Sequence, residues 1–253
     1  MMAETLLPVI TMPGLCAVVV FGGSFDPPQI GHVHAALAAR RWLAAAIGRS
    51  EAAVGLVFVP AARSPFKDAA PAASDQQRID MLKLVVADIA GATVWTEEID
   101  RAAAVPCGQK RSPSYTIDTI TRARAQLDRA GRVSVPMRLL IGTDQAREFH
   151  RWKDAEDLLT LAPPIIVSRE RESTPRALAH ELRTSHHWSD RQADILAASV
   201  VPVEALEASS TAVRAALSAG EAEGERHVSP AVYDYIKRHG LYGVRRPHAA
   251  DQR

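Results

Sequence analysis

The chain has 253 residues, 47% of them hydrophobic, and a formal net charge of +1 at pH 7. This length is enough for one large domain or two small ones, and for a substantial core. The balanced charge gives no overall basic field for nucleic acid, and no apolar run approaches the length of a membrane span. We therefore expect neither nucleic acid nor a membrane as a partner, while the oligomeric state cannot be read from the sequence.

The two cysteines, Cys16 and Cys107, match no disulfide or metal-site spacing, which indicates reduced thiols. The first residues include Glu4 and lack the basic start of a secretory signal, so we expect a cytoplasmic protein. His186 and His187 are adjacent, point apart on a helix and have no companions at metal-ligand spacing. We predict no metal ligands among the side chains.

Six short apolar runs alternate with helical patterns along the chain. The predicted strands are residues 17–21, 54–59, 93–96, 138–141, 165–168 and 200–203. Ser74 and Gln77 predict a capping box ahead of a helix at 78–89. Ser114 is expected to cap a helix that ends at Arg129, and Ser229 one that ends near Gly240.

This order of elements predicts the fold class. Continuous apolar strands that alternate with helices are typical of a doubly wound, mostly parallel α/β sheet of the Rossmann-like kind. We predict a single domain at 17–244, preceded by an N-terminal extension at 1–16 and followed by a polar tail at 245–253. Within it, residues 169–199 read as a peripheral charged segment.

The first chemical motif lies at residues 18–32, where a buried strand leads through a glycine turn to a helix start. Gly22 and Gly23 let backbone approach an anion closely, and the helix start offers N–H groups and a favourable dipole. Gln29 and His32 are three residues apart and share one helix face. The chain has neither a Walker glycine loop nor a Gly-x-Gly-x-x-Gly fingerprint, so phosphate binding here needs another device.

A second motif, Ser209-Ser210-Thr211 followed by Arg214, has the same logic. Hydroxyls and N–H groups at a helix start, with an arginine one turn later, make a second anion cradle. We expect the two cradles to converge, with Ser24, His32 and Arg214 around one cavity.

Together these motifs resemble the nucleotidyltransferase superfamily, whose signature ends in His or Thr, any residue, then Gly-His. The longer Gly-Gly-Ser-Phe-Asp-Pro form resembles the nicotinate-nucleotide adenylyltransferases. Three further segments resemble the same enzymes, in the family's order: Ser114-Tyr115-Thr116, Ile141-Gly142-Thr143-Asp144, and Phe149 to Trp152. The resemblance covers residues from about 18 to about 242.

The resemblance implies a role for each matched residue. Phosphate groups would be held by His32, Lys67 and Arg214, with Gln29 as a weaker donor. The rest of the ATP site would be formed by Gly22, Gly23, Ser24, Phe25, Gly31, Gly142, Asp144, Ser209, Ser210 and Thr211. The pyridine nucleotide would be bound by Tyr115, Thr116 and Trp152, with the indole stacked on the ring. The implied reaction joins ATP and nicotinate mononucleotide to give deamido-NAD and pyrophosphate, with Mg²⁺ accompanying ATP.

Two positions depart from the family pattern: Gln29 and Phe66 each stand where the family has histidine. Glutamine donates a neutral hydrogen bond, roughly half as strong as a charge-assisted one. Two alternatives therefore stay open. The chain could be a nucleotide-binding homologue with weak or no catalysis. It could also be a sibling nucleotidyltransferase with another phosphate acceptor, such as phosphopantetheine, although the Ser-Tyr-Thr segment and Trp152 argue against that.

Overall fold

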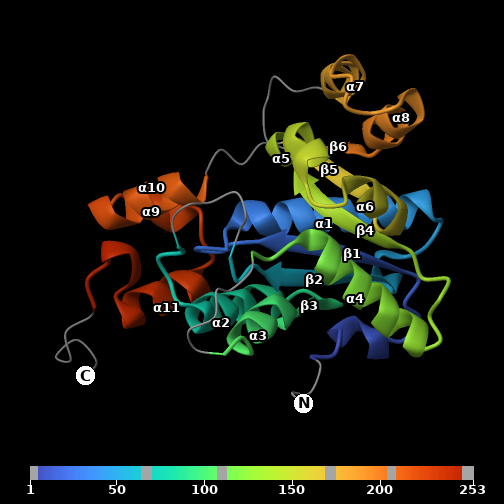
Figure 1. Cartoon of the computed structure of the whole chain (residues 1–253). Coiled ribbons are helices and arrows are strands. Elements are labelled where there is room, and N and C mark those ends of the chain that lie inside the picture. Colours follow the sequence, from blue (N-terminus) through green and yellow to red (C-terminus); the bar gives the residue numbers. More distant parts are fainter. Residues whose placement is uncertain (1–4, 64–69, 107–112, 169–174, 204–208, 247–253) are drawn as a thin grey trace.

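The computed structural model of the chain describes residues 5–63, 70–106, 113–168, 175–203 and 209–246. Its centre is a six-stranded sheet in the order β3-β2-β1-β4-β5-β6, and every neighbouring pair is parallel (Figure 1). The strands are β1 (Ala17–Gly23), β2 (Val54–Pro60), β3 (Ala92–Val94), β4 (Met137–Gly142), β5 (Pro164–Ser168) and β6 (Val200–Pro202). All six strands agree with the sequence prediction to within a few residues, and the doubly wound fold is confirmed.

Helices cover both faces of the sheet because successive residues of each strand point to opposite faces. In β1, Val19 and Phe21 pack in one core cluster with α1 (Ile30–Ala46) and with Leu82 of α2 (Asp75–Val86). Val18 and Val20 pack in the other. The helices of that second cluster are α4 (Thr116–Arg129), α5 (Thr143–Glu148), α6 (Ala155–Leu161), α7 (Pro175–Thr184) and α8 (Asp190–Ala198).

A third apolar cluster holds the C-terminal helices. It joins Met81 and Val85 of α2 to Val213 of α9 (Ser210–Ala219) and Ile236 of α11 (Pro230–His239). The remaining elements of this part are α10 (Ala222–Arg226) and the 3-10 turn η4 (Leu241–Gly243). Figure 1 shows α9, α10 and α11 grouped at the left, where α1 begins. This third cluster is therefore a separate packing unit that contacts α2. It includes α9, the helix that begins with the second predicted cradle.

Two of the predicted helix caps are present and one is wrong. Ser74 and Gln77 form the capping box, and Ser229 accepts from the N–H of Val232. Ser114 does not cap α4, which begins at Thr116 without any side-chain cap. The reason is that Ser114 lies one residue before the N-cap position, which Tyr115 occupies. The Ser114 hydroxyl hydrogen-bonds to Glu98 of α3 (Glu97–Ala103).

Two segments expected at the periphery contribute to the core. In the predicted extension, Leu7 and Val9 are buried at the start of and within the 3-10 turn η1 (Pro8–Thr11). The Leu7 N–H donates to Gln126 Oε1 at 2.6 Å. The charged segment folds into α7 and α8, which lie side by side next to the edge strand β6 (Figure 1). α7 buries Leu178 and Leu182, and α8 buries Ala193 and Leu196, so the segment covers the sheet edge. Within the described residues, no helix is both long and apolar enough to cross a bilayer.

Candidate active site

The strand order reverses between β1 and β4, and the ligand sites of doubly wound sheets lie at such a point, beyond the carboxyl ends of the strands. Gly22 and Gly23 end β1, and Gly142 ends β4 as the residue before α5. Asp144 is exposed in the first turn of α5. The glycine loop and the Gly142–Asp144 segment, far apart in sequence, therefore follow neighbouring strands.

The two glycines of the loop serve different purposes. A Cβ on Gly23 would lie 3.1 Å from the Phe25 ring, so glycine allows that ring to fold back over the loop. Gly22 has no described atom within 4 Å of an added Cβ, and its φ is not in the left-handed region. Since neither packing nor backbone geometry requires glycine there, the open space suits a ligand in contact with the backbone. Phe25 itself is buried with φ +47°, so it offers backbone and not its ring.

His32 is oriented by its neighbours. Its Nδ1 accepts a hydrogen bond from the Gln29 N–H at 2.9 Å, and its ring packs edge-on against Phe25 at 5.1 Å between centroids. A ring whose Nδ1 accepts carries its proton on Nε2 when neutral. This hydrogen bond therefore places the proton of neutral His32 on Nε2.

The start of α1 is less free than the sequence suggests. The Ile30 N–H, in the first turn, donates to the His227 carbonyl at 2.9 Å. Gln29 is 5% exposed, and its Nε2 donates to Ser210 Oγ at 3.0 Å across 181 residues of sequence. Gln29 therefore ties the start of α1 to the start of α9.

The α9 cradle is partly occupied by its own capping bonds. Ser209 Oγ accepts from the Ala212 N–H at 3.1 Å, while Thr211 is exposed and its Oγ1 accepts from Arg214 Nη2 at 3.4 Å. Arg214 Nη1 donates to the Asp26 carbonyl at 2.8 Å and lies 3.6 Å from Asp26 Oδ2. Arg214 thus reaches the glycine loop directly, which brings the two predicted cradles together.

Two residues that fix this loop were not predicted as site residues. The Asp26 side chain is buried and accepts from the N–H groups of Ala72 and Ala73, at 2.8 and 3.1 Å. Arg78 is fully buried; its Nη1 donates to the Ser24 carbonyl at 2.7 Å, and its Nη2 pairs with Asp75 at 2.6 Å. For Arg78 the available signal was a charged residue on the helix face that also carries Met81 and Leu82, because a buried charge needs a partner.

The predicted pyridine residues also lie together. Tyr115 and Thr116 begin α4, and Trp152 follows the 3-10 turn η3 (Phe149–Arg151). Lys153 links the two segments, because its Nζ lies 4.9 Å from the Tyr115 ring centroid and 3.3 Å from Asp118 Oδ1. Trp152 is half-buried, with its ring 5.2 Å from that of Phe149.

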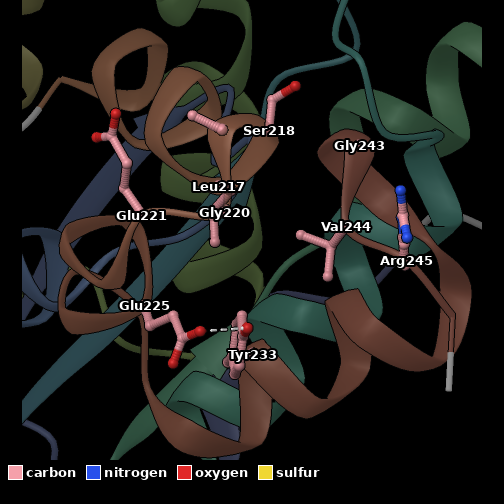
Figure 2. Close-up of a pocket in the computed structure, with 10 residues that line it drawn as sticks. Leu217, Ser218, Gly220, Glu221, Glu225, Tyr233, Gly243, Val244 and Arg245 are labelled. Carbon is pink, nitrogen blue, oxygen red and sulfur yellow. Dashed lines mark hydrogen bonds between the residues drawn. The ribbon is translucent and has the colours of Figure 1, made fainter.

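Two cavities lie near these elements. One, of about 340 Å³, is bordered by Trp152 and by His150 and His187, whose rings stack at 3.7 Å; the rest of its wall is Asp154, Ala155, Glu156, Asp157 and Trp188. The other, of about 320 Å³, lies between α9 and the C-terminal turn (Figure 2). That second cavity contains none of the predicted site residues. Ser24, His32 and Arg214 line neither of these two cavities, so the predicted cavity around them stays a prediction.

Buried carboxylates flank the start of α4. Burial raises the pKa of Glu97, although Arg101 and Arg122 beside it oppose the shift. Burial also raises the pKa of Glu98, against hydrogen bonds from Thr119 and Ser114. These groups support the helix that carries the predicted pyridine residues.

The structure does not test every predicted site residue. Lys67 and Phe66 lie outside the described residues, so the role of Lys67 stays a prediction. Among the residues that are described, no three His, Cys, Asp or Glu side chains lie together as a set of metal ligands.

Comparisons with known proteins show the family to which this chain belongs. The family model described as cytidylyltransferase-like matches residues 20–216. A protein of Stenotrophomonas maltophilia named "Probable nicotinate-nucleotide adenylyltransferase" is 32% identical over 231 residues, which cover 88% of this chain and 96% of that protein. A Laribacter hongkongensis protein of the same name is 34% identical over 244 residues, 91% of this chain and 96% of that one.

Solved structures support the fold. The Plasmodium falciparum nicotinic acid mononucleotide adenylyltransferase complexed with NaAD has a TM-score of 0.53 at 15% identity and covers 90% of this chain and 98% of that one. A nicotinate-nucleotide adenylyltransferase structure from Vibrio parahaemolyticus has a TM-score of 0.54 at 14% identity, with 90% and 96% covered. The chain belongs to the cytidylyltransferase-like nucleotidyltransferases and, within them, to the nicotinate-nucleotide adenylyltransferase family.

Proposed function

We propose that the chain transfers the adenylyl group of ATP to nicotinate mononucleotide and releases deamido-NAD and pyrophosphate, a step of NAD biosynthesis in the cytoplasm. The observation that carries the proposal is the meeting of two motifs 181 residues apart, through the Gln29–Ser210 and Arg214–Asp26 hydrogen bonds. Beside the open space at Gly22, this junction offers backbone groups, an imidazole donor and a guanidinium to one polyphosphate. Such a set of preorganised donors suits charge that builds up on phosphate oxygens.

In this reaction a phosphate oxygen of the mononucleotide attacks the α-phosphorus of ATP. One P–O bond forms, and the bond to the β-phosphate oxygen breaks as pyrophosphate leaves. Positioning and electrostatic stabilisation supply most of the acceleration in phosphoryl-type transfers. We assign the backbone at Gly22 and Gly23, His32 Nε2–H and Arg214 to the triphosphate.

Mg²⁺ fits this scheme as a companion of ATP. Mg²⁺ in such sites is held mainly by substrate phosphates and water, with one or two carboxylates, and not by an all-protein cage. When bound, the ion supplies neutralisation of phosphate charge.

We assign the acceptor to the other half of the site. Trp152 would stack on the pyridine ring, and the first N–H groups of α4 at Thr116 would receive its carboxylate with help from the helix dipole. The bacterial relatives named for nicotinate nucleotide support this choice of acceptor, as does the Plasmodium structure complexed with NaAD.

The test is pyrophosphate release from ATP and nicotinate mononucleotide, measured on this chain and on Gln29→His. A histidine at position 29 can become cationic where the amide cannot, so we expect faster turnover with little change in ATP affinity. Equal turnover of the two proteins would show that our role for position 29 is wrong.

The same assay separates the alternatives. Absence of pyrophosphate release from both proteins, together with measurable ATP binding, would favour a nucleotide-binding homologue. The burial of Gln29 and its bond to Ser210 give that alternative a physical basis, because the amide already has a structural task. Release with phosphopantetheine and not with nicotinate mononucleotide would instead identify a sibling transferase.

A further inference from the structure

The C-terminal turn η4 reaches back to the glycine loop. Tyr242 Oη donates to Asp26 Oδ1 at 2.8 Å, and the two residues are 216 positions apart. The turn also packs against α9, the helix that carries Arg214. One short segment therefore contacts both halves of the candidate phosphate site.

Asp26 is an unexpected residue beside a site for a polyanion, because its carboxylate repels phosphate. It is 3% exposed, so its charge depends on the donors around it. Oδ1 accepts from Ala73 N–H and from Tyr242, while Oδ2 accepts from Ala72 N–H and faces Arg214 at 3.6 Å. The carboxylate is thus a junction of three segments, and Tyr242 is its side-chain hydroxyl donor.

The backbone conformation of η4 and its packing on α9 are both tightly constrained. Tyr242 has φ +56° and Gly243 has φ +80°, two successive left-handed residues. A Cβ on Gly243 would lie 2.8 Å from Ser218 Oγ of α9, so the turn sits directly on that helix; Figure 2 shows Gly243 and Ser218 at the cavity between them. A left-handed conformation in a tyrosine costs on the order of 1–3 kcal/mol and persists only where the surroundings enforce it.

We propose that Tyr242 is a positioning residue of the phosphate site, which acts through Asp26 on the glycine loop and on the guanidinium of Arg214. The expected effect of Tyr242 on turnover rests on the proposed function. The link between Tyr242 and Asp26 rests on the geometry alone. Burial, with Asp26 close by, raises the pKa of the Tyr242 hydroxyl far above its usual range, so it remains a donor throughout the working pH range.

The chain offers a matched control for the test. Tyr235 Oη also donates to an aspartate, Asp80, at 3.1 Å in the same apolar cluster, but that bond joins α11 to α2 and not to the loop. Tyr242→Phe and Tyr235→Phe therefore remove the same kind of bond from the same packing unit. We expect Tyr242→Phe to lower kcat about tenfold and Tyr235→Phe to change it by less than about twofold.

A double-mutant cycle with Arg214→Gln distinguishes positioning from general support. If Tyr242 acts on Arg214, the tenfold effect of Tyr242→Phe shrinks to about twofold in the Arg214→Gln background. Effects that multiply independently would overturn the proposal, as would equal kcat values for the two phenylalanine variants.

A second readout does not depend on turnover. Amide hydrogen exchange at Ala72 and Ala73, whose N–H groups donate to Asp26, should accelerate in Tyr242→Phe and stay unchanged in Tyr235→Phe. If the chain proves inactive but this exchange difference appears, the proposed function fails and the link between Tyr242 and Asp26 stands. Unchanged exchange in Tyr242→Phe would overturn that link whatever the activity.

Discussion

The two halves of the candidate site are held in different ways. In the phosphate region, which we define as residues 22–32 and 209–214, Asp26 and Gln29 are buried and join segments remote in sequence, as does the buried Arg78 beside them. Arg214, 31% exposed, joins the same loop. In the pyridine region, residues 115–118 and 152–153, the link is the exposed pair of Lys153 and Asp118, whose side chains are 45% and 33% exposed.

The two regions therefore differ in how far their side chains are held in place before a substrate binds. A buried polar group that loses its hydrogen-bond partner raises the free energy of the folded state. The buried bonds of the phosphate region therefore hold it in one well-defined arrangement. An exposed ion pair contributes little, and a half-buried tryptophan can adjust to a ring placed against it. We therefore expect substitutions in the phosphate region to affect the chemical step, and those in the pyridine region to affect the binding of the acceptor.

The largest effect is expected for Arg214→Met. The change removes the guanidinium that bonds to the loop and, in our account, stabilises the transition state, so kcat/KM should fall by on the order of 10²–10³. Pyrophosphate release measures it. Arg226→Met is the control, since Arg226 is exposed on α10 and pairs with Glu223 at 3.6 Å. Similar activities of the two variants would show that Arg214 does not act on the triphosphate.

A smaller and selective effect is expected for Trp152→Ala. Loss of an aromatic stacking partner costs roughly 1–3 kcal/mol, so KM for nicotinate mononucleotide should rise about tenfold or more while KM for ATP stays near its original value. Steady-state kinetics with each substrate varied in turn provides the measurement. An equal rise in both constants would mean that the two regions are not separate in the way we describe.

The smallest effect concerns stability and pH. Glu98 supports the start of α4, and burial raises its pKa above the usual value near 4.5. The folded state therefore binds this proton more tightly than the unfolded state does, so the contribution of Glu98 to stability is full below about pH 4.5 and is lost as the pH rises above it.

Glu98→Gln removes that dependence and keeps an acceptor for Thr119. The free energy of unfolding in urea should be higher for the variant than for the parent at pH 7, and the gap should close toward pH 4. A gap that stays constant across this range would mean that the carboxyl of Glu98 is not the titrating group.

The sequence predicted the fold well because its signals are local. Continuous apolar runs marked all six strands, and the capping pair Ser74 and Gln77 marked the start of α2. The prediction missed α7 and α8, since their charged residues hide a narrow apolar stripe. It placed the cap at Ser114 wrongly, because the helix begins one residue later, with Tyr115 at its N-cap.

The candidate site was predicted less completely, for a related reason. Glycines, hydroxyls and an arginine at helix starts are recognisable in sequence, and the structure brings those of the phosphate region together. Asp26 has partners 46 to 216 residues away, and Arg78 reaches a backbone carbonyl 54 residues away. No local pattern specifies such bonds, since they depend on how separate segments meet.

The most direct test of the central claim is a crystal structure of the chain with a non-hydrolysable ATP analogue. We expect the triphosphate to lie against the backbone of Gly22 and Gly23, within hydrogen-bond distance of His32 Nε2 and of Arg214. A triphosphate bound away from the junction of β1, α1 and α9, for example in the cavity beside His150 and His187, would contradict it.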